Sequence, residues 1–229
     1  MPVLAPSLST GGDRQAYATL VTSDSYVIGA LVLAASLREH SPGSAHVPIV
    51  VLHAPTLSAE AIEALQTAFD VLVPIAPLHS GAHGRDARNL QLLGRPELDV
   101  TYSKLHVWTL TDYDKVVFLD ADTLVCDGVE ALFGYNELAA APDCGWPDIF
   151  NSGVFVLRPS TETFDQLVAF AAASGSWDGA DQGLLNDFFA GSWNRIPFVY
   201  NVTPTSVYTY APAFQRYVPL YAFLLSCSN

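Results

Sequence analysis

Two acidic side chains, Asp120 and Asp122, stand two positions apart where an apolar run ends. The four residues before them, 116–119, are aliphatic or aromatic, which is typical of a buried strand. Carboxylate oxygens at the end of such a strand suit a hard divalent cation such as Mn²⁺ or Mg²⁺. A cation of this kind would neutralise the diphosphate of a nucleotide, so the pair predicts a nucleotide-sugar site. The alternative is a solvated acidic turn, because short acidic pairs are common.

Three polar segments follow the acidic pair along the chain. They are Asn151-Ser152-Gly153, which opens an apolar run, then residues 175–186, which contain Asp178-Gly-Ala-Asp181-Gln182, and residues 201–214, which contain Tyr208-Thr-Tyr210. This series, in this order, resembles glycogenin and its relatives in retaining glycosyltransferase family 8. The resemblance covers roughly residues 16–214 and rests on several independent motifs.

Alternating strands and helices must position these motifs. We expect strands at 16–21, 47–53, 71–75, 116–119, 147–157 and 195–200, and helices at 26–39, 58–68, 101–110, 161–173 and 181–189. This order predicts an α/β fold with a mostly parallel sheet covered on both faces and a ligand site beyond the strands' carboxyl ends.

The predicted architecture is one domain over residues 15–214. The resemblance implies a Rossmann-like nucleotide-sugar-binding domain of the GT-A type. We expect residues 1–14 to be a flexible leader, residues 76–94 a mobile loop near the site, and residues 215–229 a divergent apolar tail.

Composition excludes several classes of partner. Ten basic against 23 acidic residues give a net charge of −13, which repels nucleic acid and anionic membrane surfaces. No apolar run reaches the roughly 18 residues of a membrane span. The three cysteines are odd in number and lack metal-like spacing, and no signal-peptide pattern opens the chain, so we expect a cytoplasmic protein.

The turn after the first strand carries Thr22, Ser23 and Tyr26. The resemblance implies that these residues form the uracil and ribose pocket of UDP-glucose, with the Tyr26 ring stacked on the base. Without the resemblance, Tyr26 would be interpreted as a packed helix aromatic.

Arg95 and Lys104 are two of only ten basic residues. The resemblance implies that both contact the nucleotide sugar. The alternative is an exposed ion pair with Glu97 or Asp99, which would contribute little to stability.

The resemblance assigns the sugar site to five polar residues. It implies that Asn151, Ser152 and Asp178 bind the substrate, and that Asp181 and Gln182 contact the transferred glucose. Asp181 would act as a nucleophile or would stabilise the oxocarbenium-like transition state, and front-face attack assisted by the diphosphate is the other mechanism open to a retaining enzyme. Capping of the following helix is the structural alternative for Asp178 and Asp181.

Tyr208 and Tyr210 would face the same side if their segment were extended. The resemblance implies that the first glucose is placed on Tyr208. Without it, the two rings would be interpreted as ordinary core or interface aromatics.

The chain departs from the family pattern at its end. Relatives continue into a strand with a histidine that completes the metal site and then into a Lys-Pro-Trp segment, whereas all six histidines here precede Asp120. We therefore expect weaker metal binding, and we form the hypothesis that a shortened form has reduced activity.

The expected function is Mn²⁺- or Mg²⁺-dependent transfer of glucose from UDP-glucose to a tyrosine and then to a glucan, which primes glycogen. The resemblance also implies a homodimer and glycogen synthase as a partner. Two alternatives stay open: a relative with a small acceptor, of the galactinol synthase type, and an inactive partner that binds nucleotide sugar or glycogen synthase.

Overall fold

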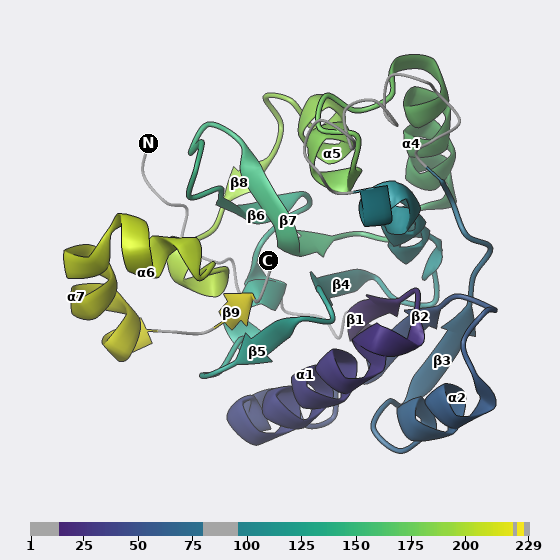
Figure 1. The fold of residues 1–229 in the computed structure, drawn as a ribbon, viewed down its shortest axis with the longest axis horizontal. Coiled ribbons are helices and arrows are strands. Elements are labelled where there is room, and N and C mark those ends of the chain that lie inside the picture. Colours follow the sequence, from purple (N-terminus) through teal and green to yellow (C-terminus); the bar gives the residue numbers. More distant parts are fainter. Residues whose placement is uncertain (1–13, 80–95, 222–223, 227–229) are drawn as a thin grey trace.

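The computed structural model describes residues 14–79, 96–221 and 224–226 (Figure 1). Within them, seven strands form one sheet in the order β3-β2-β1-β4-β7-β6-β8, and β5 pairs with β9. The strands are β1 (Gln15–Val21), β2 (Ile49–His53), β3 (Val71–Pro74), β4 (Lys115–Leu119), β5 (Thr123–Val125), β6 (Ala139–Pro142), β7 (Phe150–Leu157), β8 (Asn194–Arg195) and β9 (Leu224–Ser226).

Helices cover both faces of this sheet. The α-helices are α1 (Val27–His40), α2 (Ala59–Gln66), α4 (Thr161–Ser174), α5 (Asp181–Phe188), α6 (Thr205–Thr209) and α7 (Ala211–Tyr221). The 3₁₀ helices are η1 (Asp24–Tyr26), η2 (Pro42–Ser44), η4 (Pro96–Thr109), η5 (Glu130–Gly134) and η6 (Phe198–Tyr200). Figure 1 shows α6 and α7 at one end, beyond β8 and β9. No helix within the described ranges is both long and apolar enough to cross a lipid bilayer.

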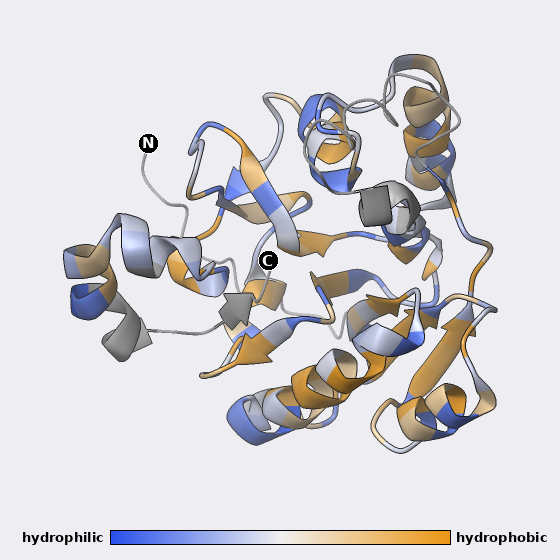
Figure 2. Ribbon diagram, viewed as in Figure 1, coloured by the Kyte–Doolittle hydropathy of each residue, from blue (hydrophilic) through white to orange (hydrophobic). Residues whose placement is uncertain are grey.

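Two hydrophobic cores form because successive side chains of a strand point to opposite faces. In β4, Val117 and Leu119 pack in the core that contains α1 and α2, whereas Val116 and Phe118 pack in the core that contains η4, α4 and α5. Figure 2 shows hydrophobic residues filling β3 and much of α1. The expected α/β fold with a mostly parallel sheet is confirmed.

The sheet brings separate motifs to one edge. β1, β2, β3 and β4 are parallel, so the turns after β1 and β4 lie at the same edge. β7 runs antiparallel to β4 and pairs Val154 with Leu119, so the first residues of β7 lie where β4 ends. The backbone N–H of Asp120 donates to the carbonyl oxygen of Gly153 at 2.8 Å and fixes this junction.

Capping agrees with the expected helix start at Ser58. The Ser58 hydroxyl accepts from the Ala61 N–H at 3.1 Å and begins α2, as the sequence predicts. The expected helix at 101–110 is instead part of the 3₁₀ helix η4, which begins at Pro96.

Two expectations near the C-terminal half differ from the structure. The predicted strand at 195–200 is wrong except at its first residue, since β8 ends at Arg195 and residues 198–200 form η6. Pro197 lies between them and has no N–H to donate to a ladder. The alanine-rich β6 was not expected, because alanine has low strand propensity.

The leader, the loop and the tail expected from the sequence are only partly covered by the described residues. The leader lies outside the described residues apart from residue 14, as does the loop from residue 80 onward. The expected domain end at residue 214 falls inside α7, and β9, within the expected tail, pairs with β5.

Gly29 allows α1 to rest directly on the turn between the two acidic residues. A Cβ atom at this position would lie 2.6 Å from the carbonyl oxygen of Ala121. That separation is too short for a side chain, so the helix and the Asp120–Asp122 turn are placed by backbone contact.

We expect Gly29→Ala to lower the free energy of unfolding by about 1–3 kcal/mol, because overpacking outweighs the better helix propensity of alanine. Chemical denaturation measures this change. Ala35→Gly, at an exposed position of the same helix, calibrates propensity alone. A Gly29→Ala variant more stable than the parent chain would contradict the contact.

Candidate active site

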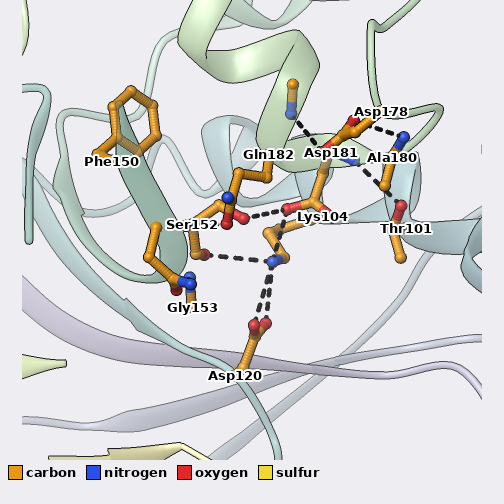
Figure 3. Close-up of polar contacts among 12 residues, drawn as sticks. Thr101, Lys104, Asp120, Phe150, Ser152, Gly153, Asp178, Ala180, Asp181 and Gln182 are labelled. Carbon is orange, nitrogen blue, oxygen red and sulfur yellow. Dashed lines mark hydrogen bonds and ion pairs between the residues drawn. The ribbon is translucent and has the colours of Figure 1, made fainter. Parts of the chain in front are cut away.

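A buried lysine lies at the centre of the site (Figure 3). The Lys104 side chain, 7% exposed, places Nζ 2.7 Å from Oδ2 of Asp181 and 3.0 Å from Oδ1 of Asp120. The same ammonium donates to the carbonyl oxygen of Ser152 at 3.2 Å and lies 5.3 Å from the centroid of the Phe118 ring. Lys104 therefore joins η4, β4, β7 and α5, and because it is buried it does not form the exposed ion pair that was its alternative.

The charges in this cluster depend on one another. Burial lowers the pKa of Lys104, but the carboxylates of Asp120 and Asp181 together raise it more, so the ammonium stays charged. Burial raises the pKa of Asp120 to about 7; the Lys104 ammonium opposes this change, while Asp181 and Asp122 add to it. Near neutral pH, a cation that binds the Asp120 carboxyl would therefore compete with a proton.

Asp181 is held at the first position of α5. Its Oδ2 accepts from the Ser152 hydroxyl at 2.7 Å as well as from Lys104. Its backbone N–H donates to the Thr101 hydroxyl at 3.2 Å. These bonds attach the start of α5 to β7 and to η4, so the carboxylate has one defined position.

The side-chain carbonyls of Gln182 and Asn151 both accept from the backbone of β7. Oε1 of Gln182 accepts from the Ser152 N–H at 3.2 Å, and Oδ1 of Asn151 accepts from the Gly153 N–H at 2.9 Å. A Cβ atom at Gly153 would lie 3.3 Å from Oδ2 of Asp120, so the strand passes close to that carboxylate.

Asp178 caps the start of α5. Its carboxylate accepts from the Ser176 hydroxyl and from the N–H groups of Ala180 and Gly183, at 2.5, 2.9 and 3.0 Å. Burial raises the pKa of Asp178, partly offset by these hydrogen bonds. Asp178 therefore caps the following helix, which was the structural alternative to a role in substrate binding.

Asp120 and Asp122 are the residues that could hold a divalent cation. The Asp122 side chain is half-buried and has no hydrogen bond or ion pair to another described residue. In the described part of the chain, no three or more His, Cys, Asp or Glu side chains are arranged so that they could together hold a metal ion. Two carboxylates fit Mg²⁺ or Mn²⁺ when phosphate oxygens of a substrate complete the coordination, as is common at nucleotide sites.

The turn after β1 reaches the same edge of the sheet. Tyr26 is 42% exposed, so it is not a core aromatic. Ser23 is exposed and Thr22 is half-buried, and the Ser23 hydroxyl lies 2.7 Å from that of Ser25. These side chains are accessible beside the acidic pair. Arg95 lies outside the described residues.

The two tyrosines lie in a helical segment. Tyr208 belongs to α6 and is 86% exposed, while Tyr210 directly follows α6 and is 61% exposed. The segment is not extended, so the condition for a shared face is not met. Neither ring is a core aromatic, because each is largely in solvent, and the interpretation as interface aromatics stays open.

Several residues of the site had no role in the sequence predictions. Thr101 anchors Asp181, Asn201 donates to Oδ1 of Asn151 at 2.7 Å, and Asn186 exchanges two hydrogen bonds of 2.9 Å with the Phe150 backbone. Their only signal was nearness in sequence to the motifs. His106 packs against the ring of Phe164, with centroids 5.1 Å apart, and its Nε2 lies 2.8 Å from the carbonyl oxygen of Ala76.

Comparison with known proteins gives a consistent family. The model of the family described as "Glycosyl transferase family 8" matches residues 18–217. Glycogenin-1 of Homo sapiens is 49% identical over 207 residues, covering 88% of this chain and 57% of the human protein. Glycogenin-1 of Mus musculus is 48% identical over 209 residues, covering 89% and 60%. The chain thus spans about 60% of the length of these relatives.

Solved structures share the fold. The galactosyltransferase LgtC, in complex with donor and acceptor sugar analogs, matches with a TM-score of 0.67 and 20% identity, covering 93% of this chain and 87% of that one. The glycosyltransferase GlyE of Streptococcus pneumoniae TIGR4 matches with a TM-score of 0.66 and 21% identity, covering 94% and 55%. The architecture is that of the GT-A glycosyltransferases, as expected.

We expect Lys104→Met to lower the free energy of unfolding by about 3 kcal/mol, because it leaves two carboxylates near each other without their cation. Denaturant unfolding at pH 8 measures the loss, and it should shrink toward pH 5 as Asp120 takes up a proton.

Arg14→Met is the matched control, since Arg14 pairs with Asp114 at 3.2 Å on the surface. It should cost much less than Lys104→Met. Equal effects of the two variants would contradict the central place of Lys104.

Proposed function

The chain belongs to glycosyl transferase family 8, and from this premise we propose that it transfers glucose from UDP-glucose, with retention, to its own tyrosine and then to the growing glucan. Such a reaction primes glycogen in the cytoplasm. The observation that carries the proposal is the cluster of Lys104 with Asp120 and Asp181 at the edge where a nucleotide sugar would bind. The similarity to proteins named glycogenin supports the choice of glucose.

The reaction exchanges one bond at C1 of the sugar for another. The bond from C1 to the diphosphate oxygen breaks, and its electron pair leaves on that oxygen. The acceptor hydroxyl oxygen bonds to C1, and its proton passes to the departing diphosphate. Negative charge therefore grows on the diphosphate while positive charge grows on the sugar ring.

The residues divide this work by their charge. Asp120 and Asp122 would hold a divalent cation, Mn²⁺ in our proposal, which when bound supplies Lewis-acid stabilisation of the diphosphate. Lys104 adds a fixed positive charge, and Arg95 is proposed as a second. Thr22, Ser23 and Tyr26 would bind the uridine.

The sugar would lie against β7 and α5. Asn151, Ser152, Asp178 and Gln182 are proposed to bind it, with Asp181 nearest the reacting carbon. Oδ2 of Asp181 accepts from Lys104 and Ser152, and such bonds make a carboxylate less nucleophilic. The geometry therefore favours Asp181 as a stabiliser of the oxocarbenium-like transition state over Asp181 as a nucleophile.

The acceptor is proposed to be Tyr208. Its ring is 86% exposed, so it can enter the active site of another copy of the chain while α6 stays folded. Self-association as a homodimer and binding to glycogen synthase are further parts of the proposal, carried by the family alone.

We expect the chain, incubated with UDP-glucose and Mn²⁺, to gain successive hexose units detectable by intact mass spectrometry. Tyr208→Phe should abolish the gain because it removes the acceptor oxygen, while Tyr210→Phe should retain it. Asp120→Ala should lower the rate by at least about 100-fold, because the site loses a cation ligand.

Three outcomes would redirect the proposal. Hexose gain in Tyr208→Phe would exclude Tyr208 as acceptor. Transfer to an added polyol such as inositol, with no gain of mass by the chain, would favour the small-acceptor alternative. Binding of UDP-glucose with no transfer to any acceptor would favour the inactive partner.

We expect Mn²⁺ binding to weaken as the pH falls below 7. The cation needs the ionised Asp120 carboxylate, whose pKa is about 7, so below that pH each bound cation displaces a proton. The apparent affinity should fall by up to about tenfold per pH unit. Calorimetry in buffers of different ionisation enthalpy measures both quantities, and Asp120→Asn should show no proton release. Equal affinity at pH 6 and pH 8 would exclude this linkage.

A further inference from the structure

Asp143 links the β6–β7 loop to two side chains of the site. Its Oδ1 accepts from the N–H groups of Gly145 and Trp146 at 2.7 and 3.3 Å. Its Oδ2 accepts from Nδ2 of Asn151 and from Nε2 of Gln182, both at 3.3 Å. One oxygen therefore shapes the loop, and the other contacts residues proposed to bind the sugar.

Both amides are oriented at their two ends. The carbonyl oxygen of each accepts from a backbone N–H, of Gly153 for Asn151 and of Ser152 for Gln182. Backbone donors cannot reverse their role, so each NH₂ group must point toward Asp143. Rotation of either amide would set two donors against each other at β7 and two acceptors against each other at Asp143.

This arrangement decides what the amides can offer a ligand. Each NH₂ group has two N–H bonds and uses one on Asp143, so one N–H of each remains. The carbonyl of Asn151 already accepts from Gly153 and from Asn201, whereas that of Gln182 accepts from Ser152 and keeps one lone pair. Each amide therefore presents one N–H donor, which suits sugar and phosphate oxygens.

We propose that Asp143 is a positioning residue that fixes Asn151 and Gln182 as hydrogen-bond donors toward the transferred sugar. Asp143 acts through these two side chains, and its carboxylate needs no contact with the substrate. If Asp143 only shaped the loop, Oδ1 would be enough. Oδ2 instead accepts from one amide of β7 and one of α5, so it serves the positioning role and not the loop.

The first test needs no activity. Side-chain NH₂ resonances of the ¹⁵N-labelled chain are compared among the parent, Asp143→Asn and Asp143→Ala, with the Gln182 pair identified by its absence in Gln182→Ala. We expect that pair to shift or broaden in both Asp143 variants. Asp148→Asn is the matched control in the same loop; its 85% exposed carboxylate lies 3.8 Å from Arg195, and it should leave the pair unchanged.

The second test rests on the proposed function and measures glucose transfer. We expect Asp143→Asn to lower kcat by about 10- to 100-fold with a smaller change in KM, because misplaced donors cost alignment more than binding. In a Gln182→Ala background the same change should cost clearly less, since part of its target is gone.

Each outcome bears on one proposal. An unchanged Gln182 pair in both Asp143 variants, or losses of kcat that simply multiply in the double variant, would overturn the positioning role. A parent chain that transfers no glucose but shows the expected resonance shifts would support the positioning of the amides and reject the proposed reaction.

Discussion

The buried ammonium of Lys104 is the contact on which the site depends. Two carboxylates, that of buried Asp181 and that of half-buried Asp120, converge at 2.7 and 3.0 Å from one nitrogen, and this cation offsets their mutual repulsion. The same nitrogen donates to the β7 backbone, so charge neutralisation and strand placement use one side chain. A nucleotide sugar that brings negative charge to this edge would therefore meet one fixed positive charge that two carboxylates already share.

Close backbone approach is the second constraint. At Gly29 and Gly153 a side chain would meet the acidic turn, and at Gly183 it would collide with Asp178 and Ser176. These three glycines allow α1, β7 and α5 to converge on residues 120–122 and 176–178. Hydrogen bonds and ion pairs link these elements, so a shift of any one of them would displace the carboxylates.

The family and the fold are established by similarity to known proteins, whereas the function is a proposal that rests on the chemistry of the site. The identity of nearly half to proteins named glycogenin establishes the family, and structures at about 20% identity establish the GT-A architecture. The cluster of Lys104, Asp120 and Asp181 supplies the chemical argument for glucosyl transfer. The orientation of the amides by Asp143 adds a reason why this site would favour oxygen-rich, acceptor-bearing ligands.

The sequence by itself determined the family, the alternation of strands and helices and the acidic pair at the end of β4, because these depend on local residue order. Residue order could not reveal that Lys104 lies between Asp120 and Asp181, or that Asp143 reaches Gln182, since those partners are far apart in the chain. It also misjudged residues 198–200, because a short apolar run such as Phe-Val-Tyr fits a strand as well as a helix. It left the conformation around Tyr208 open. Only the tertiary structure decided these points, because the antiparallel return of β7 and the packing of η4 and α5 bring distant residues to one edge of the sheet.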